Sequence, residues 1–134
     1  MTSLTDIESL DELNIGKLKS IGITSVERLL LAGSQKKWRM KLASKLGVNE
    51  AILSFWVSQA DLLRIDGLNS SWIPTLVGMG ISSIQELAVQ SPVDVHTNFT
   101  KFYERNGYSS NLPGLIAVVD WISKASMLPA IIKN

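Results

Sequence analysis

A nine-residue stretch that occurs twice constrains the fold of this chain more than any other feature. Residues 22–30, Gly-Ile-Thr-Ser-Val-Glu-Arg-Leu-Leu, return 58 positions later as Gly-Ile-Ser-Ser-Ile-Gln-Glu-Leu-Ala, residues 80–88. In each copy a glycine, Gly22 or Gly80, separates two apolar patterns with helical spacing. Glycine is the residue best suited to the left-handed position that closes a helix. The chain therefore repeats a unit in which two helices meet at a tight turn.

The residues after each glycine predict where the next helix begins. Thr24 and Ser82 are good N-cap residues, and Glu27 and Gln85 follow three positions later. This spacing is typical of a capping box, in which the two side chains each bond to a free backbone N–H group. We therefore expect two helices that begin at equivalent positions.

Apolar residues recur with helical spacing along the whole sequence, and no stretch alternates with period two over more than a few residues. The predicted class is therefore all-α, with about eight short helices in two sets of four. In the third segment, Trp38 is expected on the buried face together with Leu42, Ala43 and Leu46. The starts of further helices are predicted at Ser34, Asn49 and Ser91. Helix termination is predicted at Gly47 and before Pro129.

A second internal match, at an offset of 65, aligns residues 56–60 with residues 121–125 and pairs Trp56 with Trp121. The two offsets differ by seven residues, which predicts an insertion around residues 93–110. We interpret residues 1–64 as the first half and residues 65–134 as the second. Helices this short cannot bury an apolar face alone, so the halves should pack as one compact body with a shared core.

The composition excludes several classes of protein. Apolar residues make up 46% of the chain and charged residues 19%, which suits a buried core and argues against disorder. No apolar run approaches the roughly 20 residues that cross a bilayer. The N-terminal residues do not resemble a signal peptide, so we expect a cytoplasmic location, or an organelle stroma or matrix if a presequence has been removed. The absence of cysteine and the single histidine, His96, argue against a disulfide or a zinc site.

Paired short helices joined by glycine turns, and present twice, resemble the helix-hairpin-helix superfamily. The sequence is more specifically similar to the family called domain of unknown function 4332. The similarity lies in Leu63-Arg64-Ile65-Asp66-Gly67-Leu68, in the turn at Gly80 with the following Ser-Ile-Gln-Glu-Leu, and in residues 56–65, which resemble the family's Trp-Val…Ala-Asp-Leu-Arg-Ile connection. It covers nearly the whole chain and implies a duplicated helix-hairpin-helix fold.

The superfamily resemblance implies DNA binding through a Gly-x-Gly hairpin, whose N–H groups and following helix N-terminus hold a phosphate. This sequence departs from that pattern. The second half keeps Gly67 but has Asn69 in place of the second glycine, with Asp66 beside it. The first half has Ser9 and Asp11 at the equivalent positions, and a carboxylate repels a phosphate. Gly67 and Asn69 are therefore candidate contacts of a weakened anion site.

One segment is strongly basic although the net charge is only +1. Residues 28–49 contain six basic residues and no acidic one. On a helix, Lys37, Lys41 and Lys45 align at i, i+4 and i+8. Such a stripe suits a nucleic-acid backbone or an acidic protein, or is only a solvated surface that keeps the protein soluble. The candidate binding residues here are Lys36, Lys37, Trp38, Arg39, Lys41 and Lys45.

Aromatic residues gather in the predicted insertion, where they either cover the core or form a contact patch. They are Phe99, Phe102, Tyr103 and Tyr108. Trp56 and Trp121 should anchor the core, and burial is also the favoured interpretation for Trp38 and Trp72, with an exposed contact anchor as the alternative.

Nothing in the sequence indicates catalysis. His96 and Asp94 are two residues apart, so on a helix they face different directions, and no serine or threonine completes a triad. No phosphate loop, dinucleotide fingerprint or metal-ligand spacing is present. We expect no enzyme activity, cofactor, metal, membrane contact or small-molecule substrate. The prediction is a helical adaptor that binds a protein through residues 36–45 or 99–108, with sequence-independent nucleic-acid binding through residues 36–45 as the alternative.

Overall fold

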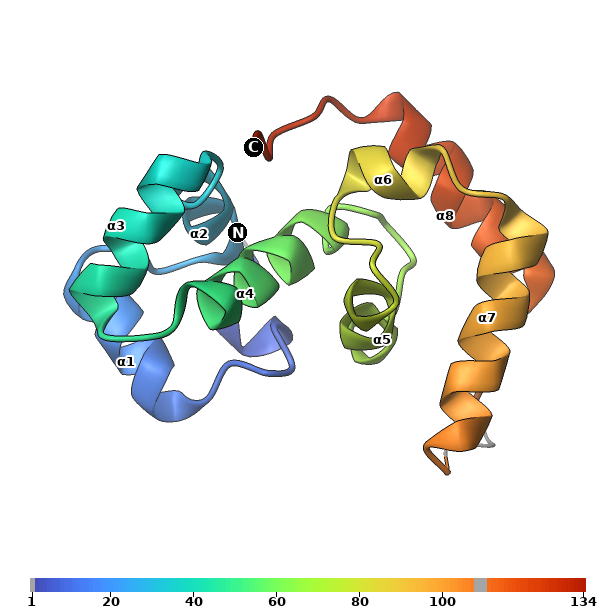
Figure 1. The fold of residues 1–134 in the computed structure, drawn as a ribbon, viewed down its shortest axis with the longest axis horizontal. Helices are drawn as coiled ribbons and strands as arrows, with labels where there is room; N and C mark the ends of the chain where they lie inside the picture. Colours follow the sequence, from blue (N-terminus) through green and yellow to red (C-terminus); the bar gives the residue numbers. More distant parts are fainter. Residues whose placement is uncertain (1, 108–110) are drawn as a thin grey trace.

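The computed structural model of the chain describes residues 2–107 and 111–134. Over these residues the chain forms eight α-helices, two short 3-10 helices and one isolated β-bridge between Gln35 and Lys133, so the predicted all-α class is confirmed (Figure 1). The elements are η1 (Leu4–Asp6), α1 (Glu12–Ser20), α2 (Val26–Ala32), α3 (Lys36–Leu46), α4 (Glu50–Leu62), η2 (Ser70–Trp72), α5 (Ile73–Gly78), α6 (Ile84–Ala88), α7 (Pro92–Arg105) and α8 (Leu115–Met127).

The helices of the two halves correspond at the offsets found in the sequence. At an offset of 65, α4 matches α8 over its whole length, and at 58, α1 matches η2 together with α5. Gly22 and Gly80 have φ angles of 88° and 96°, so each is the left-handed residue that was predicted to close a helix. The connection from α7 to α8 is longer than that from α3 to α4, which accounts for most of the predicted insertion. Residues 108–110 of that connection lie outside the described part of the chain.

The helices after these glycines begin one residue later than predicted. Ser25 and Ser83 are the N-caps, and their side chains accept hydrogen bonds from the N–H groups of Arg28 and Glu86. Either residue of the Thr-Ser or Ser-Ser pair is able to cap a helix, and capping by the second one buries the apolar residue that follows it. These caps replace the predicted capping boxes, which consisted of Thr24 with Glu27 and Ser82 with Gln85.

Helix α3 also begins later than predicted, because Gln35 rather than Ser34 is its N-cap. The Gln35 side chain makes no capping hydrogen bond within the described residues. Ser34 lies one residue before the cap, and its carbonyl oxygen accepts a hydrogen bond of 2.7 Å from the N–H of Lys133. The predicted helix starts at Asn49 and Ser91 are confirmed.

The buried apolar side chains form two clusters instead of the single shared core that the sequence predicted. One cluster consists of residues from the first half together with Ile132, and the other extends from Leu62 to Ala125. Leu63 packs against both clusters. The reason is the length of α4, which at about 1.5 Å per residue extends from the first half into the second (Figure 1). Each half therefore buries its own apolar faces around one end of α4.

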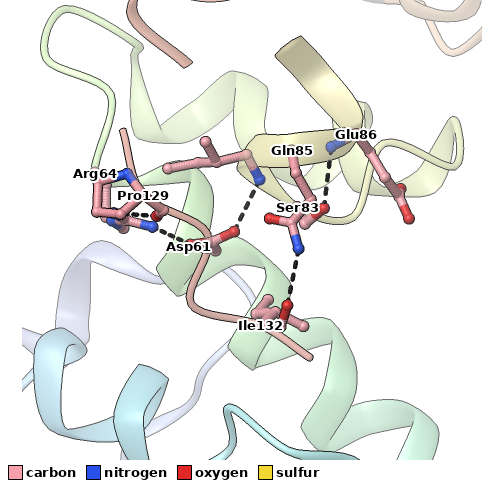
Figure 2. Close-up of polar contacts among 8 residues, drawn as sticks. Asp61, Arg64, Ser83, Gln85, Glu86, Pro129 and Ile132 are labelled. Carbon is pink, nitrogen blue, oxygen red and sulfur yellow. Dashed lines mark hydrogen bonds and ion pairs between the residues drawn. The ribbon is translucent and has the colours of Figure 1, made fainter. Parts of the chain in front are cut away.

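The end of α4 is tied to α6 and to the chain after α8 through polar contacts (Figure 2). Asp61 is fully buried and accepts hydrogen bonds from Nη1 of Arg64, at 2.9 Å, and from the N–H of Ile84, at 2.8 Å. Nη2 of Arg64 donates to the carbonyl oxygen of Pro129 at 2.8 Å. Asp61 therefore fixes the start of α6 against α4.

The C-terminal segment, residues 129–134, crosses back from α8 to the first half (Figure 1). The side chain of Ile132 is buried in the first cluster, and its carbonyl oxygen accepts a hydrogen bond of 2.8 Å from Nε2 of Gln85 on α6. The next residue, Lys133, bonds to Ser34 at the end of α2. Both α4 and the C-terminal segment thus join the two halves.

Candidate functional site

The lysines predicted to share one helix face lie on α3 and are solvent-exposed. None of Lys36, Lys37, Lys41 and Lys45 forms an ion pair with a residue that the structure describes. Lys36 and Lys37 lie in the first turn of α3, where the helix dipole favours negative charge. The stability of α3 therefore gives no reason for lysines at these two positions.

Trp38 is more exposed than predicted, and Arg39, predicted as a candidate binding residue of the basic segment, is buried. Trp38 is 40% exposed, whereas Arg39 is only 6% exposed. The buried positions of α3 are 39, 42, 43 and 46, which follow the i, i+3, i+4, i+7 spacing of one helix stripe. Trp38 lies at the edge of that stripe, next to Leu42, so much of its ring remains in contact with solvent. Arg39 therefore leaves the predicted lysine surface and points to the interior side of the helix.

Arg39 is a buried cation held by neutral partners. Its Nη1 donates to the carbonyl oxygen of Gly33 at 2.8 Å, and its Nη2 donates to Oδ1 of Asn134 at 2.5 Å. A Cβ atom at Gly33 would lie 2.5 Å from Cγ2 of Val57, so only glycine allows the end of α2 to approach α4 this closely. No described carboxylate lies within ion-pair distance of the guanidinium. Burial lowers the pKa of Arg39, and the charge of Glu50 opposes this shift.

A groove of about 510 Å³ lies where α4, α6 and the C-terminal segment meet. Arg39, Ser58 and Gln85 contribute polar atoms to its lining. Ser58 is 8% exposed and its hydroxyl has no hydrogen-bond partner among the described residues. Oε1 of Gln85 is buried and also has no partner there, although Nε2 of the same side chain bonds to Ile132 (Figure 2). The groove therefore contains a cation, a hydroxyl and a free acceptor.

Side chains of the protein itself cap the helix start that follows each hairpin. Gly67 has a φ of 88°, as its turn requires, but Oδ1 of Asn69 accepts a hydrogen bond of 2.9 Å from the N–H of Ser71. In the first half, Oδ1 of Asp11 accepts one of 2.9 Å from the N–H of Asn14. In both halves a side chain of the protein itself thus occupies an N–H group at the helix start that would face a phosphate.

The predicted aromatic cluster is divided between core and surface. Phe99 is fully buried, and Tyr103 stacks on it with ring centroids 5.0 Å apart, so these two residues cover the core of the second half. Phe102 remains 37% exposed. Trp72 is half-buried against Trp121, with centroids 5.5 Å apart. Tyr108 lies outside the described residues.

The structure brings the start of α3 together with residues from the C-terminal segment. A second hollow, of about 390 Å³, is lined by Lys36, Lys37 and Lys133, and it shares Asn134 with the groove. The aromatic and hairpin candidates line neither hollow. Sequence reasoning missed Ser58, Gln85 and Lys133, because their proximity to Arg39 or α3 depends on the path of the C-terminal segment, for which the sequence carries no local signal.

The fold defines an all-α protein made of two corresponding sets of helices. The chain belongs to the family described as Domain of unknown function (DUF4332), whose model matches residues 9–128, so the similarity found in the sequence is confirmed. No curated protein and no solved structure matches the chain. In the part of the chain that the structure describes, no helix has the length and apolar character needed to span a membrane. No group of three or more potential metal ligands is present in that part either.

Proposed function

We propose that the protein is a non-catalytic binding module that contacts an acidic protein partner through α3, as an adaptor or subunit of a larger assembly. The observation that supports this is the composition of the exposed side of α3. Lys37, Lys41 and Lys45 form its centre, and the geometry of the helix places Trp38 on one side of them and Met40 on the other. We call this the α3 surface, and it consists of Lys36, Lys37, Trp38, Met40, Lys41 and Lys45.

The charge of the α3 surface is not a requirement of the repeat. The third helix of the second half, α7, contains Asp94, Lys101, Glu104 and Arg105, and so carries no net formal charge. Helix α3 contains five basic residues and no acidic one. A helix at this position therefore folds without a basic face, which favours a binding role for the lysines over a purely solubilising one.

Two features favour protein over nucleic acid. Trp38 and Met40 are 40% and 52% exposed, and tryptophan and methionine are enriched in protein interfaces. In each half a side chain of the protein, Asn69 or Asp11, already occupies one N–H group at the helix start that follows the hairpin. The second candidate function is sequence-independent nucleic-acid binding, which the regular spacing of the exposed lysines favours. With four phosphates neutralised, affinity would fall about 100-fold between 50 and 200 mM salt.

The test is an affinity purification from the native cell, with and without nuclease, that compares three forms of the protein. The forms are the wild type, the triple variant Lys37→Glu/Lys41→Glu/Lys45→Glu, and the control Lys101→Glu on the exposed side of α7. We expect one defined partner with wild type and control, independent of nuclease, and its loss with the triple variant. Recovery that requires intact nucleic acid, with salt-dependent binding of an oligonucleotide, would establish the second candidate instead. A partner retained by the triple variant would contradict both.

Three further parts of the proposal rest on the sequence. We propose that the repeat unit is of the helix-hairpin-helix type, in which the glycine turns were kept and the anion-binding hairpins were lost. We propose no catalytic role, cofactor or substrate turnover for the α3 surface. A location in the cytoplasm, or in an organelle stroma or matrix after removal of a presequence, completes the proposal and can be checked by imaging a tagged full chain.

A further inference from the structure

The groove between the halves contains polar groups that the fold leaves without partners. The Arg39 guanidinium has several N–H donors, of which only two bond to described residues. The Ser58 hydroxyl and Oε1 of Gln85 bond to none. Buried polar groups in folded proteins nearly always have a hydrogen-bond partner. Oε1 of Gln85 is such a buried group without a partner, and it lines one groove together with the Arg39 guanidinium and the Ser58 hydroxyl, so the groove is a candidate site for a bound molecule.

These groups specify the chemistry of that molecule. The planar fork of an arginine pairs best with a carboxylate or a phosphate, and the Ser58 hydroxyl is able to donate to the same anion. Oε1 of Gln85 only accepts, so the molecule must also contain an N–H or O–H donor. Phe55 and Val77 add apolar surface to the groove, whose volume lies in the range of small-molecule sites.

The surroundings support an anionic ligand. Lys36, Lys37 and Lys133 line the hollow that shares Asn134 with the groove, and they raise the positive potential near Arg39. Glu86 is the carboxylate that lines the groove, and both the N–H and the hydroxyl of Ser82 donate to its Oε2 at 2.9 Å. That carboxylate is thus held by its own helix start and does not neutralise Arg39 as an ion pair.

We propose that this groove binds a small organic anion, whose carboxylate or phosphate group pairs with Arg39 while its hydrogen-bond donor reaches Gln85. This inference goes beyond the proposed function and does not depend on it. Arg39 and Lys41 point to opposite sides of α3, one buried and one exposed, so the groove and the α3 surface are separate sites.

The test uses three probes that share a ring and an amide N–H and differ in one group. They are 4-acetamidobenzoate, 4-acetamidophenyl phosphate and the neutral 4-acetamidobenzamide. Each is titrated into the ¹⁵N-labelled full chain and followed by the NMR signals of the Arg39 side chain and of the Ser58 and Gln85 amides. We expect saturable shifts with at least one anion, which identifies the preferred group, and affinity at least about tenfold lower for the neutral amide.

Two variants keep the test independent of any folding defect at Arg39. Ser58→Ala removes one donor, and Gln85→Glu places a negative charge in the groove, so we expect about tenfold weaker anion binding in each. Ser123→Ala is the matched control, because Ser123 is the exposed equivalent of Ser58 on α8. The double variant Lys41→Glu/Lys45→Glu should leave the affinity within about twofold, because charges on the exposed side of α3 are screened by solvent.

Four results would overturn the proposal. They are equal affinity for the neutral amide, unchanged affinity in both Ser58→Ala and Gln85→Glu, equal affinity for inorganic phosphate, and binding of an acidic peptide in the groove when no probe binds. The last result would assign the groove to the protein partner. Loss of anion binding in Lys41→Glu/Lys45→Glu with unchanged affinity in Ser58→Ala would place the anion on the α3 surface and equally reject the groove.

Discussion

Helices α4 and α8 hold the same place in the two halves, but the rest of the protein covers them to different extents. Trp56 and Trp121 are buried at equivalent positions. Asp61 and Leu62, near the end of α4, are also fully buried, whereas the equivalent of Leu62 on α8, Met127, is 79% exposed. A helix of this repeat thus has one face that every half must bury and a second face that is buried only where another half packs on it.

The second face of α4 is also the one that contributes to the groove. Ser58 lines the groove, whereas Ser123, its equivalent on α8, is exposed to solvent. The duplication therefore explains why each half contains this helix. The groove exists only on α4, because only there does the other half pack on the second face of the helix. A binding site of this kind cannot exist in a single half, since α6 and the C-terminal segment form the other walls.

The largest expected effect tests the face that both helices share. We expect Trp56→Ala and Trp121→Ala each to lower the free energy of unfolding by about 3–5 kcal/mol, because each removes a fully packed aromatic ring from its cluster. Urea denaturation followed by circular dichroism measures both. A loss below about 1 kcal/mol for either variant would break the equivalence of the two positions.

The next effect tests the buried polar contact that only α4 has. We expect Asp61→Ala to cost about 3–4 kcal/mol, since it leaves Arg64 and the buried N–H of Ile84 without their shared acceptor. The matched variant on α8, Ser126→Ala, should change stability by less than about 0.5 kcal/mol, because that side chain is exposed. Similar effects from the two substitutions would show that the second face of α4 has no special role.

An apolar pair tests the same second face. Leu62→Ala should destabilise the protein by about 2–4 kcal/mol because it opens a cavity at the edge of the second cluster. Met127→Ala, at the equivalent exposed position, should stay within about 0.5 kcal/mol of the wild type. Thermal unfolding ranks the two variants directly, and the comparison fails if Met127→Ala is the more damaging change.

The smallest effect tests the helix starts in the two halves. Ser25→Ala and Ser83→Ala should each cost about 1 kcal/mol, which is the usual contribution of an N-cap hydroxyl. Thr24→Ala should cost less than about 0.5 kcal/mol, since Thr24 is not the cap. The reverse order in urea denaturation would restore the cap position expected from the sequence.

Local signals made most of the fold predictable. A glycine such as Gly22 closes a helix through its own backbone conformation, and the offsets of 58 and 65 in the sequence predict which helices correspond. The exact residue at which a helix begins was harder to predict, and two N-caps lie one residue later than expected. The choice between Thr24 and Ser25 as cap depends on which register buries Val26, and periodicity does not determine a register to one residue.

The sequence predicted the exposed lysines of the candidate site but not the burial of Arg39 or the groove. The exposed lysines of α3 follow from a charge pattern within one helix, but the burial of Arg39 requires the close approach of α2 to α4 at Gly33. The groove also requires residues 129–134 to return to the first half. Contacts of this kind join segments far apart in the chain, and neither the spacing of apolar residues nor the composition predicts them.

The position of Ile132 has a practical consequence for dissecting the molecule. A fragment that ended at Arg64 would keep the first set of helices but lack the isoleucine that fills part of their interior. The complementary fragment would carry that isoleucine with nothing to insert it into. Neither piece is therefore a self-sufficient unit, and mixing the two fragments to reconstitute the whole is a sounder route to studying each half than truncation.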